Sequence, residues 1–196
     1  MLMASTVEIA TVFIVDDDPA MRSAMSSLVR SVGLAVETYQ SAQAFLDDRD
    51  RDRPGCLVLD VRMPGMSGLE LQDLLLERNV RLPLIMVTGY GNVPMAVRAL
   101  KAGAVAFLEK PFNDQELLDA IHNAIEIDRD RRRLDDLSAV QQQWQRRLAR
   151  LTPVEYEIMD LILEGKTNKT IATALDMSSK AIEMIRASIM AKLRDR

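Results

Sequence analysis

The fold of this chain is decided by the stretch Val12-Phe13-Ile14-Val15-Asp16-Asp17-Asp18-Pro19, in which an apolar run ends abruptly at three carboxylates and a proline. A short apolar run bounded by turn residues is typical of a strand that is buried on both faces. Proline suits the first position of a helix, and apolar residues follow it at helical spacing as far as Gly33. We therefore predict a buried strand followed directly by a helix, with the carboxylates at the joint.

The same strand-then-helix unit recurs four more times along the following part of the chain. We predict further strands at 36–39, 56–59, 84–87 and 104–108, and helices at 42–46, 69–78, 94–102 and from 114 onward. Such alternation is typical of a parallel sheet with helices on both faces. The predicted fold class of this part is α/β.

Polar side chains follow the predicted strands at their carboxyl ends, which meet at one edge of a parallel sheet. They are Asp16, Asp17 and Asp18, then Asp60, Thr88 and Lys110. Clustered carboxylates stay ionised together when they share a hard cation such as Mg²⁺. One of them can then attack a phosphoryl group, while the metal and a lysine neutralise its charge. A single Asp after a strand is usually a turn residue, but the whole set predicts phosphoryl-transfer chemistry.

These segments resemble the receiver domain of two-component response regulators, and the FixJ branch in particular. The matching residues lie at 15–19, 59–68, 87–89, 93–97, 102–104 and 109–112. The resemblance implies a flavodoxin-like, doubly wound (βα)5 fold with Asp60 as phosphoacceptor. It also implies that Asp16, Asp17, Asp60 and the backbone carbonyl of Arg62 hold Mg²⁺.

The same resemblance implies a switch and a set of partners. Thr88 would be the switch hydroxyl, Phe107 the switch aromatic, and Lys110 the lysine that precedes a cis proline. Phe107 also fits an ordinary core residue, because a strand phenylalanine packs in any case. A sensor histidine kinase or a small phosphodonor would supply the phosphoryl group, which would remodel the face built from 94–102, 104–108 and the following helix and lead to a homodimer.

One long helix is predicted from about Asp114 to Arg150, since no glycine or proline lies between Asn113 and Leu151. Its middle, residues 128–133, is too charged for a core. An apolar seam then recurs every three or four residues, at Leu134, Leu137, Val140, Trp144, Leu148 and Leu151. The seam fits either a spacer that rests on the protein's own domains or a dimerising coiled coil, and its shortness favours the spacer.

The last segment, 151–196, predicts a small all-α domain. Thr152 as N-cap, Pro153 and Glu155 form a strong helix-start signal, and that helix ends at Gly165. We predict a second helix at 168–175 and a third, capped by Ser178, to about Leu193. One face of the third helix is apolar and is expected to pack in the domain core. Its residues are Ile182, Ile185, Ile189 and Leu193.

This segment resembles the LuxR/NarL-type helix-turn-helix, in residues 151–155, 165–172 and 178–193. The resemblance implies base reading at Glu183, Met184 and Ala187 and backbone contacts from Lys169 and Lys180, with Arg186 on the flank for phosphate. Many relatives carry lysine at 183, so Glu183 either accepts from a cytosine amino group or is a solvated charge. The family usually has a fourth helix beyond Leu193 that supports dimerisation. Whether this protein dimerises through such a helix is therefore left open.

Composition and length fit a two-domain regulator. We predict a receiver domain at 1–125, a helical linker at 126–150 and the DNA-binding domain at 151–196, in a chain of 196 residues with net charge −4. The last segment carries no net charge, so its affinity for DNA must come from basic side chains placed near the bound phosphates. No 18-residue apolar run or signal peptide occurs, which predicts a cytoplasmic protein without membrane contact. The single cysteine, Cys56, fits a packed strand.

The predicted function is a phosphorylation-activated regulator of transcription, not an enzyme, with double-stranded DNA and RNA polymerase as partners. One alternative is a metal-dependent aspartyl phosphatase of the haloacid dehalogenase type, but such enzymes need a second Asp where Arg62 stands. Another is an RNA-binding antiterminator, which the helix-turn-helix segment disfavours.

Overall fold

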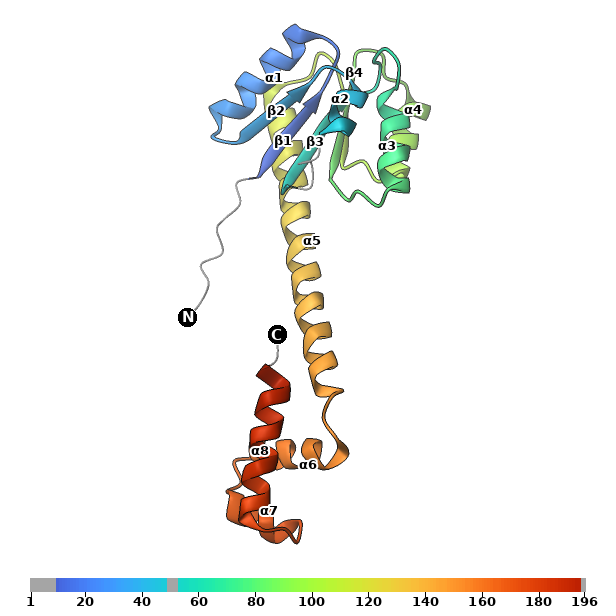
Figure 1. Ribbon diagram of the computed structural model, residues 1–196. Helices are drawn as coiled ribbons and strands as arrows, with labels where there is room; N and C mark the ends of the chain where they lie inside the picture. Colours follow the sequence, from blue (N-terminus) through green and yellow to red (C-terminus); the bar gives the residue numbers. More distant parts are fainter. Residues whose placement is uncertain (1–9, 49–52, 195–196) are drawn as a thin grey trace. The chain divides into compact units, whose positions relative to one another are not determined.

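The computed structural model describes residues 10–48 and 53–194, so the outer limits of the predicted domains, 1 and 196, lie outside the described residues. The chain divides into two compact units, Met1–Arg133 and Leu134–Arg196 (Figure 1). Within the described ranges, no helix combines the length and apolarity needed to cross a membrane.

The first unit is built on a five-stranded parallel sheet. Its strands are β1 (Thr11–Val15), β2 (Ala35–Tyr39), β3 (Gly55–Asp60), β4 (Leu84–Thr88) and β5 (Ala106–Glu109), in the order β2-β1-β3-β4-β5. This confirms the doubly wound α/β class. The order reverses between β1 and β3, which is where ligands bind in such sheets. The fifth strand begins later than residue 104, because the Ala104 N–H bonds back to the Ala99 carbonyl.

Helices cover both faces of the sheet and bury two separate apolar clusters (Figure 1). The helices are α1 (Pro19–Ser31), α2 (Ala42–Asp47), α3 (Gly68–Glu77), α4 (Val93–Lys101) and α5 (Asp114–Leu148). Residues of α1 and α5 pack on one face, and those of α2, α3 and α4 pack on the other. Cys56 is fully buried in the α1–α5 layer, as expected for a packed strand.

Helix α5 is continuous, as predicted, but the expectation that residues 128–133 are too charged for a core is wrong for Asp128. Asp128 is 1% exposed and accepts a hydrogen bond from the Gly55 N–H at 3.0 Å. Its carboxylate also pairs with Arg131 and with Arg132, whose Nε lies 2.8 Å away. Buried charge is tolerated when it is paired and hydrogen-bonded. The start of the charged stretch of α5 thus packs against the start of β3.

The second unit holds α6 (Pro153–Leu163), α7 (Asn168–Ala174) and α8 (Ser179–Arg194). The predicted capping box is present, because Thr152 Oγ1 accepts from the Glu155 N–H and Glu155 accepts from the Thr152 N–H. Ile158, Ile171, Ile182 and Ile189 form the centre of its core. The three helices confirm the predicted all-α domain.

Candidate functional site

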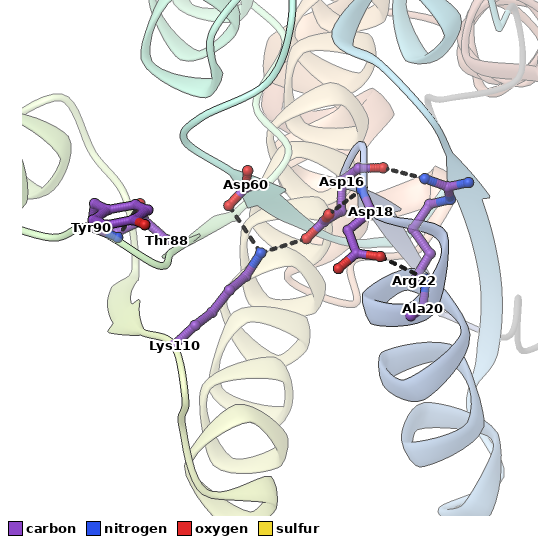
Figure 2. Close-up of polar contacts among 8 residues, drawn as sticks. All are labelled: Asp16, Asp18, Ala20, Arg22, Asp60, Thr88, Tyr90 and Lys110. Carbon is purple, nitrogen blue, oxygen red and sulfur yellow. Dashed lines mark hydrogen bonds and ion pairs between the residues drawn. The ribbon is translucent and has the colours of Figure 1, made fainter.

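Three predicted site residues meet at the carboxyl edge of the sheet, where β1 and β3 run side by side. The Lys110 ammonium points between two carboxylates, 2.6 Å from Asp16 Oδ2 and 3.0 Å from Asp60 Oδ1 (Figure 2). Asp16 is fully buried and Asp60 is 5% exposed. Sequence reasoning relied on a metal to hold the carboxylates together, whereas Lys110 already supplies part of the compensating charge.

Burial and charge act in opposite directions at this ion pair. Burial raises the pKa of the Asp60 carboxyl above its ordinary value, and the neighbouring ammonium only partly opposes this. Burial disfavours the charged form of Lys110, but its hydrogen bonds to Asp16 and Asp60 outweigh that cost and raise its pKa. Lys110 is therefore held as a cation at the carboxylates.

The donor set fits a hard divalent cation. Asp16, Asp17 and Asp60 each offer a carboxylate oxygen, and these oxygens lie within 4.8 Å of one another. Ligands that are all oxygen suit Mg²⁺. Asp18 has a different role: its Oδ1 accepts from the Ala20 N–H at 2.8 Å and caps α1. Its own N–H donates to Asp16 Oδ1, which helps to orient that carboxylate.

The predicted switch residues lie on β4, which pairs with β3, and on β5, which pairs with β4. Thr88, at the end of β4, is fully buried, and its Oγ1 accepts from the Tyr90 N–H at 3.3 Å (Figure 2). Phe107 on β5 is partly buried and packs on the α3–α4 side of the sheet. A Cβ at Gly91 would come 3.2 Å from its ring, so a side chain at position 91 would crowd the ring. The Lys110–Pro111 peptide bond is cis, as the resemblance implied.

Sequence reasoning missed two side-chain contacts at this edge. The exposed Tyr90 ring lies under the guanidinium of Arg62, 5.0 Å from its centroid, so the side chain of the predicted carbonyl ligand is itself anchored. The Arg22 guanidinium donates to the Asp16 backbone carbonyl at 2.6 Å (Figure 2). Neither contact follows from spacing along the chain, because each joins separate elements.

Most of the residues predicted to contact DNA are exposed in the second unit. Lys169 on α7 and Lys180, Glu183, Met184 and Ala187 on α8 are all exposed. Arg186 differs: it is partly buried, and its guanidinium donates to Asn168 Oδ1 at 2.8 Å. This bond ties α8 to the start of α7, the two helices of the helix-turn-helix.

Glu155 connects the start of α6 to α8. It accepts from the Lys192 ammonium at 2.6 Å and from the Ser188 hydroxyl at 2.7 Å, in addition to its capping bond. The Lys192 contact, the Thr152 N–H and the Ser188 hydroxyl together lower the pKa of Glu155 to about 2. The sequence indicated that Glu155 caps α6, but it did not indicate that the same side chain also binds Ser188 and Lys192 of α8.

A pH-dependent stability follows from Glu155. A lowered pKa in the folded state means stabilisation that is complete above the ordinary value of 4.5 and is lost as pH falls toward about 2. We expect Glu155→Gln, which can still form a capping box, to be less stable than wild type at pH 6. The difference in unfolding free energy between the variant and wild type should disappear at low pH. Urea unfolding followed through Trp144 fluorescence measures this, since the one tryptophan lies in the same unit. A gap of equal size at every pH would contradict the prediction.

Comparison with known proteins gives matches for both units. Residues 12–122 match the family described as "Response regulator receiver domain", and 149–195 match "Bacterial regulatory proteins, luxR family". Nodulation protein W of Bradyrhizobium diazoefficiens is 44% identical over 187 residues, which are 95% of this chain and 81% of that protein.

Two solved structures extend the likeness to three dimensions. The low-resolution structure of response regulator StyR has a TM-score of 0.72 and 42% identity, and covers 95% of this chain and 93% of its own. Full-length FixJ from B. japonicum has a TM-score of 0.58 and 40% identity, and covers 95% of this chain and 91% of its own.

Proposed function

The chain belongs to the response regulators that join a receiver domain to a LuxR-type DNA-binding domain, and we propose that Asp60 accepts the activating phosphoryl group. As a member of this family, the protein is a phosphorylation-activated transcription regulator and not an enzyme. The luxR-family match at 149–195 also argues against the RNA-binding alternative. The observation that carries the Asp60 assignment is the ammonium of Lys110 shared between Asp60 and Asp16.

The proposed reaction moves a phosphoryl group from a phosphohistidine of a sensor kinase, or from a small acyl phosphate, to Asp60. An Asp60 carboxylate oxygen forms the new P–O bond while the bond from phosphorus to the donor atom breaks, and that electron pair leaves with the donor. Lys110, 3.0 Å from Asp60, neutralises charge on the phosphoryl oxygens. The order reversal between β1 and β3 leaves this edge open to the donor.

Asp16, Asp17, Asp60 and the backbone carbonyl of Arg62 would hold Mg²⁺. When bound, Mg²⁺ supplies positive charge that offsets the repulsion between the phosphoryl oxygens and the carboxylates. The spacing of the three carboxylates supports this assignment.

The proposed switch uses the hydroxyl at the end of β4 and the aromatic ring on β5. Once Asp60 is phosphorylated, Thr88 turns from the Tyr90 N–H toward the phosphoryl oxygens, and Phe107 moves into the released space. The strand register supports this: on β4, Val87 pairs with Asp60 of β3 and Met86 pairs with Phe107 of β5, and Thr88 follows at the end of β4. The α4 face next to β5 carries Val93, Val97 and Leu100, all exposed, so its remodelling changes an apolar surface.

The proposed partners follow from the two domains. A sensor histidine kinase phosphorylates the receiver, the helix-turn-helix binds double-stranded promoter DNA, and phosphorylation favours a homodimer that engages RNA polymerase. A dimer suits a neutral DNA-binding domain, because two half-sites double the number of phosphate contacts.

Beryllofluoride with Mg²⁺, a mimic of the phosphorylated state, tests the function. We expect tighter binding to the protein's promoter DNA and a shift toward the dimer, measured by gel mobility shift and sedimentation. An unchanged DNA affinity, with beryllofluoride bound at the receiver, would contradict the proposal.

Glu183 provides a separate prediction for the DNA-reading surface. If its carboxylate accepts from a cytosine amino group, Glu183→Ala should change base preference at one position, by about 1–3 kcal/mol. A binding selection on randomised half-sites measures this. Lys180→Ala is the matched control, because the loss of a phosphate contact weakens binding on all sequences alike. Uniform weakening by Glu183→Ala would show that it reads no base.

A further inference from the structure

Helix α8, which carries the residues proposed to read DNA bases, is held by side chains of the helices around it. Asn168 of α7 bonds to it near its middle, and Glu155 of α6 bonds to its second half. At the end of α5, the Arg147 guanidinium donates to the Leu193 carbonyl at 3.0 Å. All of these residues belong to the second unit. Helix α5 is thus attached directly to the last turn of α8.

The contact between Arg147 and α8 is favourable in charge and in geometry. Helix α8 ends at Arg194, so the Leu193 carbonyl is one of the last four, which have no partner within the helix. A cation beside them also opposes the negative end of the helix dipole. Trp144, one turn earlier on α5, supports the guanidinium, which lies 5.2 Å from the centroid of the ring. Arg147 is therefore held from two sides.

We propose that Arg147 is a positioning residue for DNA reading, because it fixes the tilt of α8 by holding the carbonyl at its far end. This inference rests on the proposed reading of bases by α8. Glu183 and Met184 precede the anchored positions of the helix and are exposed. From Glu183 to Leu193 the helix rises about 15 Å, so a tilt of about 4° at the anchored end moves Glu183 by about 1 Å. A displacement of that size is enough to break a hydrogen bond to a base edge.

A positioning role predicts a loss that depends on the DNA sequence. Without Arg147, α8 can still take the tilt that reads bases, but it populates that tilt less, so affinity for the correct sequence falls. Affinity for an unrelated sequence comes from phosphate contacts and needs no exact tilt. The Arg147 guanidinium is occupied by the Leu193 carbonyl and the Trp144 ring, so its removal should leave the phosphate contacts in place.

Binding of the full-length chain, with Mg²⁺ and beryllofluoride, to two DNA duplexes tests this role. The selected duplex carries the sequence that wild type enriches from randomised half-sites, and the scrambled duplex has the same composition in random order. Arg147→Ala should weaken binding to the selected duplex about tenfold, as expected for one lost hydrogen bond to a charged group. Binding to the scrambled duplex should stay within about twofold. The slope of log affinity against log salt should not change, whereas loss of a phosphate contact would reduce it by about 0.9.

Three further variants serve as controls. Arg146→Ala removes the same charge from the neighbouring, exposed position of α5, and it should leave the ratio of the two affinities within about twofold. Arg147→Lys keeps a positively charged donor and should recover part of the lost affinity for the selected duplex. Trp144→Leu removes the ring that supports the guanidinium, and it should weaken binding to the selected duplex about threefold.

The outcomes separate this inference from the proposed function. Wild-type affinity of Arg147→Ala for both duplexes would overturn the inference alone. So would equal weakening on both duplexes or a reduced salt slope, because either would make Arg147 a phosphate contact. If wild type enriches no sequence, base reading by α8 is wrong and this inference fails with it. Far-UV circular dichroism shows whether Arg147→Ala is folded, and if it is not, Trp144→Leu and Arg147→Lys decide the matter by the same affinities.

Discussion

Asp60→Asn is expected to abolish phosphorylation and, with it, the increase in DNA binding that a phosphodonor causes. The amide is nearly isosteric with the carboxylate but lacks its nucleophilic charge, and it cannot ligate a hard cation as strongly. Incubation with Mg²⁺ and acetyl phosphate should add one phosphoryl group to wild type and none to the variant, by intact-protein mass. DNA binding of the variant should stay at the level of the untreated protein.

Asp73→Asn serves as the matched control for Asp60→Asn. It makes the same chemical change on the outer side of α3, where Asp73 forms an exposed ion pair with Arg98. Exposed pairs contribute little, so this variant should respond as wild type does. If Asp60→Asn still gains a phosphoryl group and responds to the donor, another residue is the acceptor.

Asp128→Ala is expected to destabilise the first unit by about 2–4 kcal/mol. The substitution leaves the buried Gly55 N–H without its acceptor and removes a carboxylate that pairs with Arg131 and with Arg132. A polar backbone group cut off from both water and a partner costs more than the hydrogen bond itself contributed. Hydrogen exchange of the β3 amides, resolved by peptide, measures the loss where it arises.

Asp130→Ala is the comparison for Asp128→Ala. Asp130 lies two positions further along α5 but is exposed, with its carboxylate 3.8 Å from Arg133. Its removal should change the opening free energy measured by hydrogen exchange of the β3 amides by no more than about 0.5 kcal/mol. Equal effects of the two substitutions would show that the charged stretch acts through general charge and not through burial of Asp128.

The contact made by Asp128 also bears on where the receiver ends. A boundary at 125 stays a prediction, yet Asp128 still contacts the first residue of β3, and Arg132 contacts the Arg53 carbonyl in the loop before it. We propose that the receiver includes this part of α5 and that the linker begins after it. Sequence reasoning ended the receiver earlier because a run of alternating acidic and basic residues looks solvated when its neighbours in space are unknown.

Local features of the fold could be read from the sequence. The β1 strand, the α1 start at Pro19, the Thr152 capping box and the continuous α5 all depend on interactions within a few residues, so spacing and residue type determine them. The acidic edge was also predictable, because parallel strands bring their carboxyl ends to one side whatever their order.

The sequence by itself therefore determined the elements, the two-domain class and the set of polar side chains gathered at the carboxyl edge of the sheet. Only the tertiary structure decided which side chains touch: Lys110 between Asp16 and Asp60, Gly55 against Asp128, and Glu155 against Lys192. Each of these contacts joins residues far apart in the chain. Such partners depend on strand order and on how helices pack, which spacing along the chain does not encode.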